Sequence, residues 1–135
     1  MPFALDASIV VAWAFPDEQH PVAGVALEHL ETEDGAVPAL WWFEVRNALI
    51  AGERRQRLGQ AGTAAFLQRL ARLPIVIDRT PEEPALLDLA RRYRLTVYDA
   101  AYLELALRLG VSLATIDNDL IYAAPRAGVP LLAAT

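Results

Sequence analysis

The chain contains no lysine, because all 12 of the basic residues among its 135 are arginines. Without lysine it cannot form a Schiff base, bind phosphate as a P-loop does, or carry the phosphorylation site of a receiver domain. Cysteine is also absent, which excludes disulfides and thiolate metal sites and leads us to expect a cytoplasmic protein. The two histidines, His20 and His29, are too far apart for i,i+4 spacing, and we interpret them as surface residues of one helix.

Long hydrophobic runs are missing too, although hydrophobic residues make up 55% of the chain. No apolar run approaches the roughly 18 residues of a membrane-spanning helix, so we expect no membrane partner. The first residues carry no basic group and reach a charge at Asp6, which argues against a signal peptide. With 135 residues, this composition predicts a single folded domain over residues 1–135.

Positive charge is in short supply, and the formal net charge is −5 at pH 7. A protein that coats nucleic acid through non-specific charge would be basic, so this balance argues against that class. An acidic chain can still act on nucleic acid if its acids gather at a metal site and its arginines surround that site.

Short apolar runs alternate with amphipathic segments along the chain. The apolar runs predict five short strands, at residues 3–5, 35–38, 74–78, the run between Gly110 and Asp117, and 129–132. Helices are predicted between and after them, at residues 7–15, 20–34, 40–58, 63–73, 80–93, 99–110 and 118–124. This alternation predicts an α/β fold, a three-layer α/β/α sandwich around a parallel sheet. Sites in such folds form at the carboxyl ends of strands, where the strand order reverses.

The helix predicted from Asp99 to Gly110 carries a carboxylate on an unexpected face. With Asp99 at 0°, Glu104 falls near 140° and Arg108 near 180° at about 100° per residue, so these two form an i,i+4 pair on the solvent side. Asp99 must then point into the protein. Burying an unpaired charge is costly, so this placement calls for a partner.

Other acids are predicted to converge on the same place. Asp6 and Asp117 each follow a strand at its carboxyl end, and they lie side by side if those strands are neighbours. Glu44 shares a stripe of the long helix with Asn47 and two alanines, which resembles the floor of a groove. Asp119 follows Asp117 by two residues.

Each of these acids also has an ordinary structural explanation. Asp6, Asp99 and Asp117 occupy positions where an aspartate caps a helix. Glu44 alone could be a surface residue, and Asp119 could complement a helix dipole. Their convergence favours another interpretation, because neighbouring carboxylates repel and shift each other's pKa values. A hard divalent cation such as Mg²⁺ removes that conflict.

Four motifs of the chain resemble those of the PIN-domain nucleases, and most of all the VapC-type toxins of toxin–antitoxin pairs. They are Asp6 with Ser8, Glu44 with Asn47-Ala48-Leu49, Tyr98-Asp99-Ala100-Ala101-Tyr102, and Thr115-Ile116-Asp117-Asn118-Asp119-Leu120. The resemblance covers the whole chain. It implies a parallel sheet of about five strands and a Mg²⁺- or Mn²⁺-dependent endoribonuclease that is the toxin of a type II pair. It further implies an antitoxin partner and a homodimer.

The resemblance also assigns roles to residues. By position, the acidic cluster would be Asp6, Glu44, Asp99 and Asp117, with Asp119 auxiliary. The polar supports would be Ser8, Asn47 and Thr115. We expect Asp6 and Asp99 to bind the metal directly, and Asp117 and Glu44 to complete its coordination, in part through water.

Two further questions stay open at the level of sequence. The arginines Arg54, Arg55 and Arg57 could hold RNA phosphates, or they could form a solvated helix end. The alternatives to a ribonuclease are a non-catalytic metal-binding or protein-interaction module on the same fold, and a PIN-type DNA nuclease. Trp41 and Trp42 are expected mainly in the core, although one of them could serve a dimer or antitoxin surface.

Overall fold

A parallel sheet forms the centre of the computed structural model, which describes residues 1–134. Its four strands within those residues are β1 (Phe3–Leu5), β2 (Gly35–Pro38), β3 (Ile75–Asp78) and β4 (Leu113–Ala114). They are ordered β3-β2-β1-β4, and every pair is parallel. The apolar runs therefore formed strands, as predicted from their alternation with helices.

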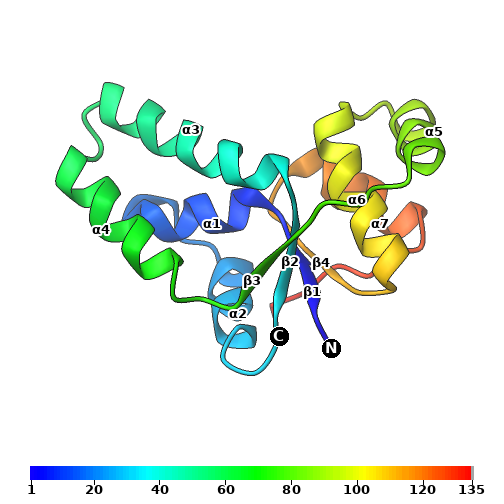
Figure 1. The fold of residues 1–135 in the computed structure, drawn as a ribbon, viewed down its shortest axis with the longest axis horizontal. Helices are drawn as coiled ribbons and strands as arrows, with labels where there is room; N and C mark the ends of the chain where they lie inside the picture. The colour runs from blue at the N-terminus through cyan, green and yellow to red at the C-terminus, as the bar shows by residue number, and fades with distance from the viewer. Residues whose placement is uncertain (135) are drawn as a thin grey trace.

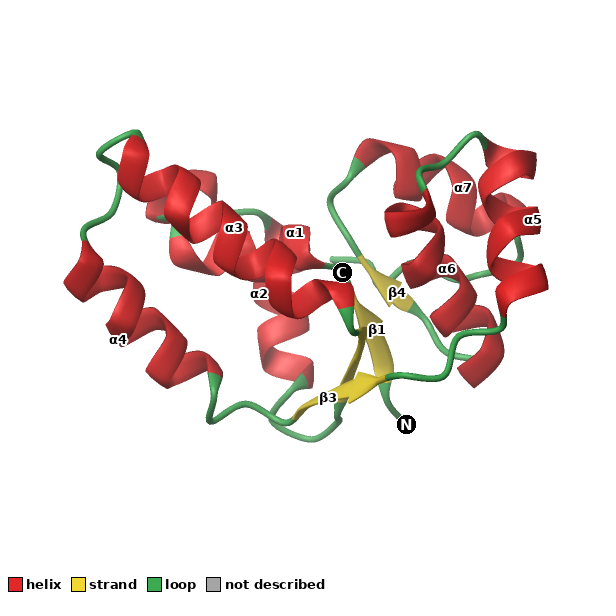
Figure 2. Ribbon diagram, turned by 45° about the horizontal axis from the view of Figure 1, so that its top comes forward, coloured by secondary structure: helices red, strands yellow, loops and turns green. Residues whose placement is uncertain are grey.

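Helices cover both faces of the sheet, which confirms the predicted three-layer sandwich (Figures 1 and 2). The helices α1 to α4 gather on one side and α5 to α7 on the other. Their bounds are α1 (Ala7–Ala14), α2 (Pro21–His29), α3 (Leu40–Arg54), α4 (Gln60–Leu70), α5 (Glu83–Tyr93), α6 (Val97–Leu109) and α7 (Asn118–Arg126), with a 3₁₀ turn η1 (Pro16–Glu18) after α1. No helix within residues 1–134 is both long and apolar enough to span a bilayer.

The last predicted strand, at residues 129–132, is reduced to a single bridge between Leu131 and Leu113. The backbone N–H of Leu113 donates to the Pro130 carbonyl at 2.9 Å, and that of Leu132 donates to the Leu113 carbonyl at 2.9 Å. Pro130 has no N–H and cannot extend this ladder. The expected five strands are therefore four strands and one bridge.

Helix α6 lies at the core of the molecule, packed against β1, β2 and α5. Every residue from Ala100 to Ala106 is buried, including Glu104, whose exposed fraction is 3%. The prediction that Glu104 and Arg108 face solvent was therefore wrong. Helical periodicity correctly places Glu104 and Arg108 on a different face of α6 from Asp99. Helix α5 packs against that face and shields it from solvent.

The strand order reverses between β1 and β4. The chain moves from β1 to β2 to β3 in one direction and then crosses to the other side of β1 to form β4. The crossover through α5 and α6 lies on the face opposite α1 to α4 (Figure 1). A crevice at the carboxyl ends of β1 and β4 is the expected position of a site in this topology. Asp6 follows β1 directly, and Asp117 comes shortly after β4.

Candidate active site

Asp6 is a buried carboxylate with an exposed fraction of 5% at the end of β1. It occupies the N-cap position of α1, yet its side chain makes no capping hydrogen bond. Instead its Oδ2 accepts from Ser8 Oγ at 2.6 Å and from Thr115 Oγ1 at 2.8 Å. Burial raises the pKa of Asp6, the two hydroxyl donors oppose that rise, and the charge of Asp117 adds to it.

The two hydroxyl groups also tie the ends of β1 and β4 together. Ser8 Oγ accepts from the backbone N–H of Ile116 at 3.1 Å, and Thr115 Oγ1 accepts from that of Asp117 at 3.0 Å. Ser8 and Thr115 therefore stand where the sequence predicted polar supports. Asn47 does not join them, because it is exposed on α3 and has no hydrogen bond to this network within residues 1–134.

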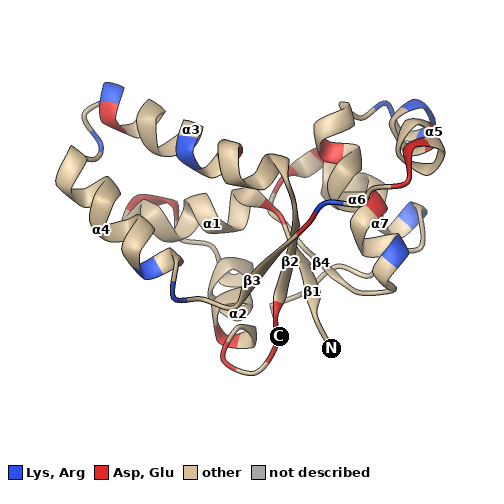
Figure 3. Ribbon diagram, in the orientation of Figure 1, with Lys and Arg blue, Asp and Glu red and all other residues tan. Residues whose placement is uncertain are grey.

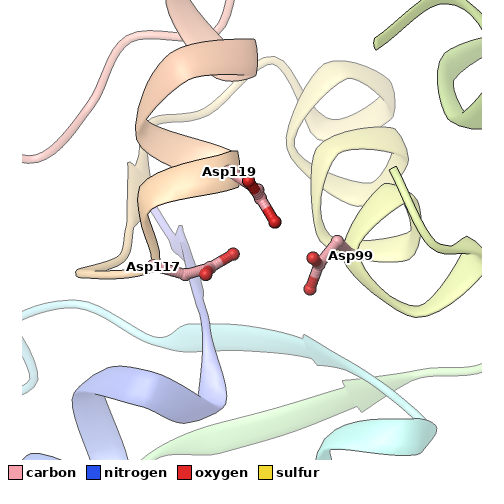
Figure 4. A group of neighbouring side chains, drawn as sticks. All are labelled: Asp99, Asp117 and Asp119. Atoms are coloured by element: carbon pink, nitrogen blue, oxygen red, sulfur yellow. The ribbon is translucent and has the colours of Figure 1, made fainter. Parts of the chain in front are cut away.

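Three more aspartates meet across the gap between α6 and α7 (Figure 4). Carboxylate oxygens of Asp99, Asp117 and Asp119 lie within 4.8 Å of one another. Asp117 stands at the N-cap of α7 but does not cap it with its side chain. Its Oδ2 is buried and finds no hydrogen-bond partner among residues 1–134. Asp119, predicted to be auxiliary, is a full member of this group.

Asp99 is not the cap of its helix. Helix α6 begins at Val97, two residues before the predicted start, and Thr96 is its N-cap. Thr96 Oγ1 accepts from the backbone N–H of Asp99 at 3.0 Å, which leaves the carboxylate of Asp99 free to face α7. Burial raises the pKa of Asp99 to about 6, with further contributions from the charges of Asp117, Asp6 and Asp119.

Glu44 reaches the same crevice from α3, where it is half-buried. Its Oε1 accepts a hydrogen bond from the hydroxyl of Tyr102 on α6. Burial raises the pKa of Glu44, the Tyr102 donor opposes this, and the charges of Asp6, Asp99 and Asp117 add to it. Sequence reasoning quoted Tyr102 within a motif but gave it no role. Its spacing of three residues from Asp99, which places both on one helix face, was the available signal.

No arginine offsets these acids. Within residues 1–134, none forms an ion pair with Asp6, Glu44, Asp99, Asp117 or Asp119. These five residues are called the acid cluster below.

The arginines predicted to hold phosphate lie at the other end of α3, which points away from the sheet (Figure 3). Arg57 packs over the ring of Phe15 and pairs with Asp17 at 2.9 Å. Arg54 and Arg55 are exposed, and ten residues of helix separate Arg54 from Glu44, which is about 15 Å.

A cavity of about 400 Å³ lies on the side of α6 that carries Glu104 and Arg108. Its apolar lining comes from the start of α3 and from α5 and α6, with Leu40, Leu86, Val97, Tyr98, Ala101 and Leu105 as members. Asp78, Glu104 and Arg108 also line it. Tyr98, the sequence neighbour of Asp99, lines this cavity, and the five residues of the acid cluster are not among its lining residues.

The acid cluster fits a hard divalent cation. Mg²⁺ and Mn²⁺ prefer oxygen ligands, and the cluster offers carboxylates with no compensating arginine. The Oδ2 atom of Asp117 is the strongest indication of a cation site. It is buried without a partner among residues 1–134, and such burial is costly unless a cation compensates it. Burial is also the largest cause of the raised pKa values of Asp6, Glu44 and Asp99.

Comparison with known proteins agrees with this fold. The PIN domain pattern matches residues 3–125, and the chain belongs to the PIN domain family. The chain is 32% identical over 126 residues to Ribonuclease VapC3 of Pyrobaculum aerophilum, covering 89% of this chain and 92% of that relative.

Two solved structures share the fold. The crystal structure of PAE2754 from Pyrobaculum aerophilum superposes with a TM-score of 0.70 at 26% identity, over 91% of this chain and 84% of that one. A toxin–antitoxin complex from Klebsiella pneumoniae contains a chain with a TM-score of 0.57 at 19% identity, over 87% of this chain and 89% of that one.

Proposed function

We propose that residues 1–135 form one nuclease domain, a Mg²⁺- or Mn²⁺-dependent endoribonuclease that hydrolyses RNA phosphodiester bonds. The observation that carries the proposal is the acid cluster, which gathers five carboxylates at the strand-order reversal with no arginine paired to them among residues 1–134. The likeness to a relative named a ribonuclease, over most of both chains, supports RNA as the substrate.

Asp99, Asp117 and Asp119 would hold the cation, because their carboxylate oxygens lie within 4.8 Å of one another. Asp6, expected from the sequence to bind the metal directly, is not part of that group and would support these ligands from the end of β1. A bound divalent ion supplies a more acidic water and neutralises charge on the scissile phosphate. Ser8 and Thr115 fix the orientation of Asp6, because both hydroxyls donate to its Oδ2. Glu44 has one oxygen held by Tyr102, so its Oε2 is the atom left to accept a proton from water.

The test uses matched RNA and DNA strands of mixed sequence. We expect cleavage of RNA with Mg²⁺ or Mn²⁺, no cleavage with Ca²⁺ at equal occupancy, and no cleavage in excess EDTA. Cleavage that persists in EDTA would contradict the metal mechanism. Cleavage of DNA alone would favour the DNA nuclease, and Mg²⁺ binding without any cleavage would favour the non-catalytic module.

We also propose that the enzyme is the toxin of a type II pair and that an antitoxin blocks the acid cluster. The apolar cavity between the start of α3, α5 and α6 suits an apolar segment of such a partner, and the acid cluster suits a basic side chain of the same partner. Expression of the toxin alone should arrest growth, and co-expression with the antitoxin should restore it. A complex in which the antitoxin leaves the cluster open would refute this arrangement.

A homodimer is proposed as the solution state. Trp42 and Phe43 on α3 are exposed by 43% and 71%, and Tyr98 on α6 by 64%, which leaves large rings uncovered on the surface. Trp41 is buried, so of the adjacent pair Trp41 and Trp42 the second is the one available for a surface role. Sedimentation equilibrium should return twice the chain mass of 14.8 kDa, and a monomer at all concentrations would contradict the proposal.

A further inference from the structure

Tyr102 places a polar group at the innermost side of the acid cluster. Its side chain has an exposed fraction of 0% and belongs to the apolar core around α6. Its hydroxyl donates a hydrogen bond to Glu44 Oε1, which joins α6 to α3. The residues are 58 positions apart in the chain, so the contact exists only in the folded protein.

The hydroxyl of Tyr102 stays protonated and can only act as the donor toward Glu44. Burial raises the pKa of Tyr102 far above its usual range, and the charge of Asp6 raises it further. Asp6 has two hydroxyl donors of its own, from Ser8 and Thr115. Glu44 has the Tyr102 donor alone among residues 1–134, and no arginine pairs with it there.

The forces on Glu44 otherwise direct it away from the site. It is half-buried on α3, so rotation of its side chain would bring the carboxylate into water. The charges that act on it, from Asp6, Asp99 and Asp117, are all negative and repel it. Hydration and repulsion therefore favour an outward rotamer, and the hydrogen bond from Tyr102 opposes them.

We infer that Tyr102 is a positioning residue, whose hydroxyl holds the carboxylate of Glu44 at the acid cluster. This inference rests on the proposed nuclease function and adds a residue to its machinery. Tyr102 touches neither the reacting atoms nor a cation in this scheme. Its effect passes through Glu44, and that restriction is what makes the inference testable.

The test is a double-mutant cycle with Tyr102→Phe, Glu44→Ala and the two together, measured as kcat and KM on RNA with saturating Mg²⁺. Tyr102→Phe keeps the ring and removes the hydroxyl, and we expect kcat to fall by about 10²-fold, as for a misplaced catalytic group, with little change in KM. In the Glu44→Ala background the same change should cost nothing further. Tyr93→Phe, a partly buried tyrosine on α5, is the matched control and should retain the wild-type rate.

Melting in EDTA gives a second measurement that does not depend on activity. Tyr102→Phe should lower the melting temperature in the wild-type background, because it breaks a hydrogen bond. In Glu44→Ala it should leave the temperature level or raise it, because the hydroxyl has already lost its partner. Equal losses in both backgrounds, in rate or in melting temperature, would overturn the inference and reduce Tyr102 to a packing residue. A wild-type protein that cleaves no RNA would refute the proposed function instead, while the melting cycle would still report on the contact.

Discussion

Two groups of acids lie toward the same end of the sheet, and one of them is paired with an arginine. Asp78 at the end of β3 and Glu104 on α6 share Arg108, whose Nε donates to Glu104 at 2.7 Å and whose Nη2 donates to Asp78 at 3.0 Å. The hydrogen bond from Arg108 lowers the pKa of Asp78. Within residues 1–134 no arginine pairs with the acid cluster, and burial raises the pKa values of Asp6, Glu44 and Asp99.

This difference separates an arginine-bound structural group from the group that we propose to be functional. With its arginine, the first group links α5, α6 and β3, and Glu104 additionally accepts from the backbone N–H of Glu82 at 3.2 Å. The charges of the acid cluster are desolvated and repel one another. We therefore expect them to lower the stability of the fold when no metal is bound. A chain that retains such a cost at a strand-order reversal is consistent with a site for an external cation.

The largest expected difference between the two groups is in RNA cleavage. Asp6→Asn removes a charge from the acid cluster, and Asp78→Asn removes one from the arginine-bound group, with little change in shape. We expect Asp6→Asn to cleave roughly 10–100-fold more slowly, as for a residue that supports metal ligands, and Asp78→Asn to cleave near the wild-type rate. Single-turnover cleavage at saturating Mg²⁺ measures both, and equal losses would erase the distinction.

The stability of the fold should depend on the arginine-bound group, which we expect to have little effect on RNA cleavage. Arg108→Met leaves Glu104, with a side-chain exposure of 3%, without its cation. Removing one partner of a buried pair is strongly destabilising, and we expect a loss of about 3 kcal/mol in the free energy of unfolding by urea. The control is Arg92→Met, which breaks the exposed i,i+4 pair with Asp88 and should cost less than about 1 kcal/mol. A loss no greater than the control would refute a structural role for Arg108.

The pH dependence of stability in EDTA should separate the groups again. Asp99 has a folded pKa of about 6 against 3.8, so the folded state binds its proton more tightly. Its contribution is present below pH 3.8 and is lost as the pH rises through 6. Asp78 has a lowered folded pKa, so its contribution is present above pH 3.8 and is lost on further acidification.

Melting curves between pH 4 and 7.5 test this prediction. The metal-free protein should gain stability as the pH falls from 7.5 toward 4, and Asp99→Asn should flatten that gain. An unchanged profile in Asp99→Asn would show that Asp99 is not under electrostatic strain.

The smallest expected effect concerns the helix cap. Thr96, and not Asp99, accepts the capping hydrogen bond at the start of α6. Thr96→Ala should lower the free energy of unfolding by about 1 kcal/mol while RNA cleavage continues. Loss of cleavage in the folded Thr96→Ala protein would show that the cap also orients the site.

The fold and the convergence of the acids were largely predictable, because both depend on local patterns. Apolar runs ending in Asp6 or leading to Asp117 predict strands that deliver carboxylates to one sheet edge. The shared face of Asp99 and the core of α6 follows from helical periodicity. These inferences need only the direction of the chain and the handedness of its connections.

The errors arose where a contact joins distant segments. The pairing of Arg108 with Asp78 spans 30 positions and that of Tyr102 with Glu44 spans 58. Local spacing places Tyr102 on the face of Asp99 but does not identify its partner. Periodicity separated the face of Glu104 from that of Asp99, but it could not reveal that α5 covers it. Arg57 likewise pairs with Asp17, which lies 40 positions away, and binding of RNA phosphate by Arg54, Arg55 and Arg57 stays a prediction.

The central claim is that the acid cluster, and not the arginine-bound group, binds a divalent cation. The most direct measurement is the change in melting temperature on replacing EDTA by Mg²⁺, for wild type, Asp99→Asn and Asp78→Asn. A ligand that binds only the folded state raises its melting temperature. The account predicts a clear rise for wild type and Asp78→Asn, and little or none for Asp99→Asn. Without metal, Asp99→Asn should be as stable as wild type or up to about 1 kcal/mol more stable, after allowance for solvent screening. A full Mg²⁺ shift in Asp99→Asn, or its loss in Asp78→Asn, would contradict the claim.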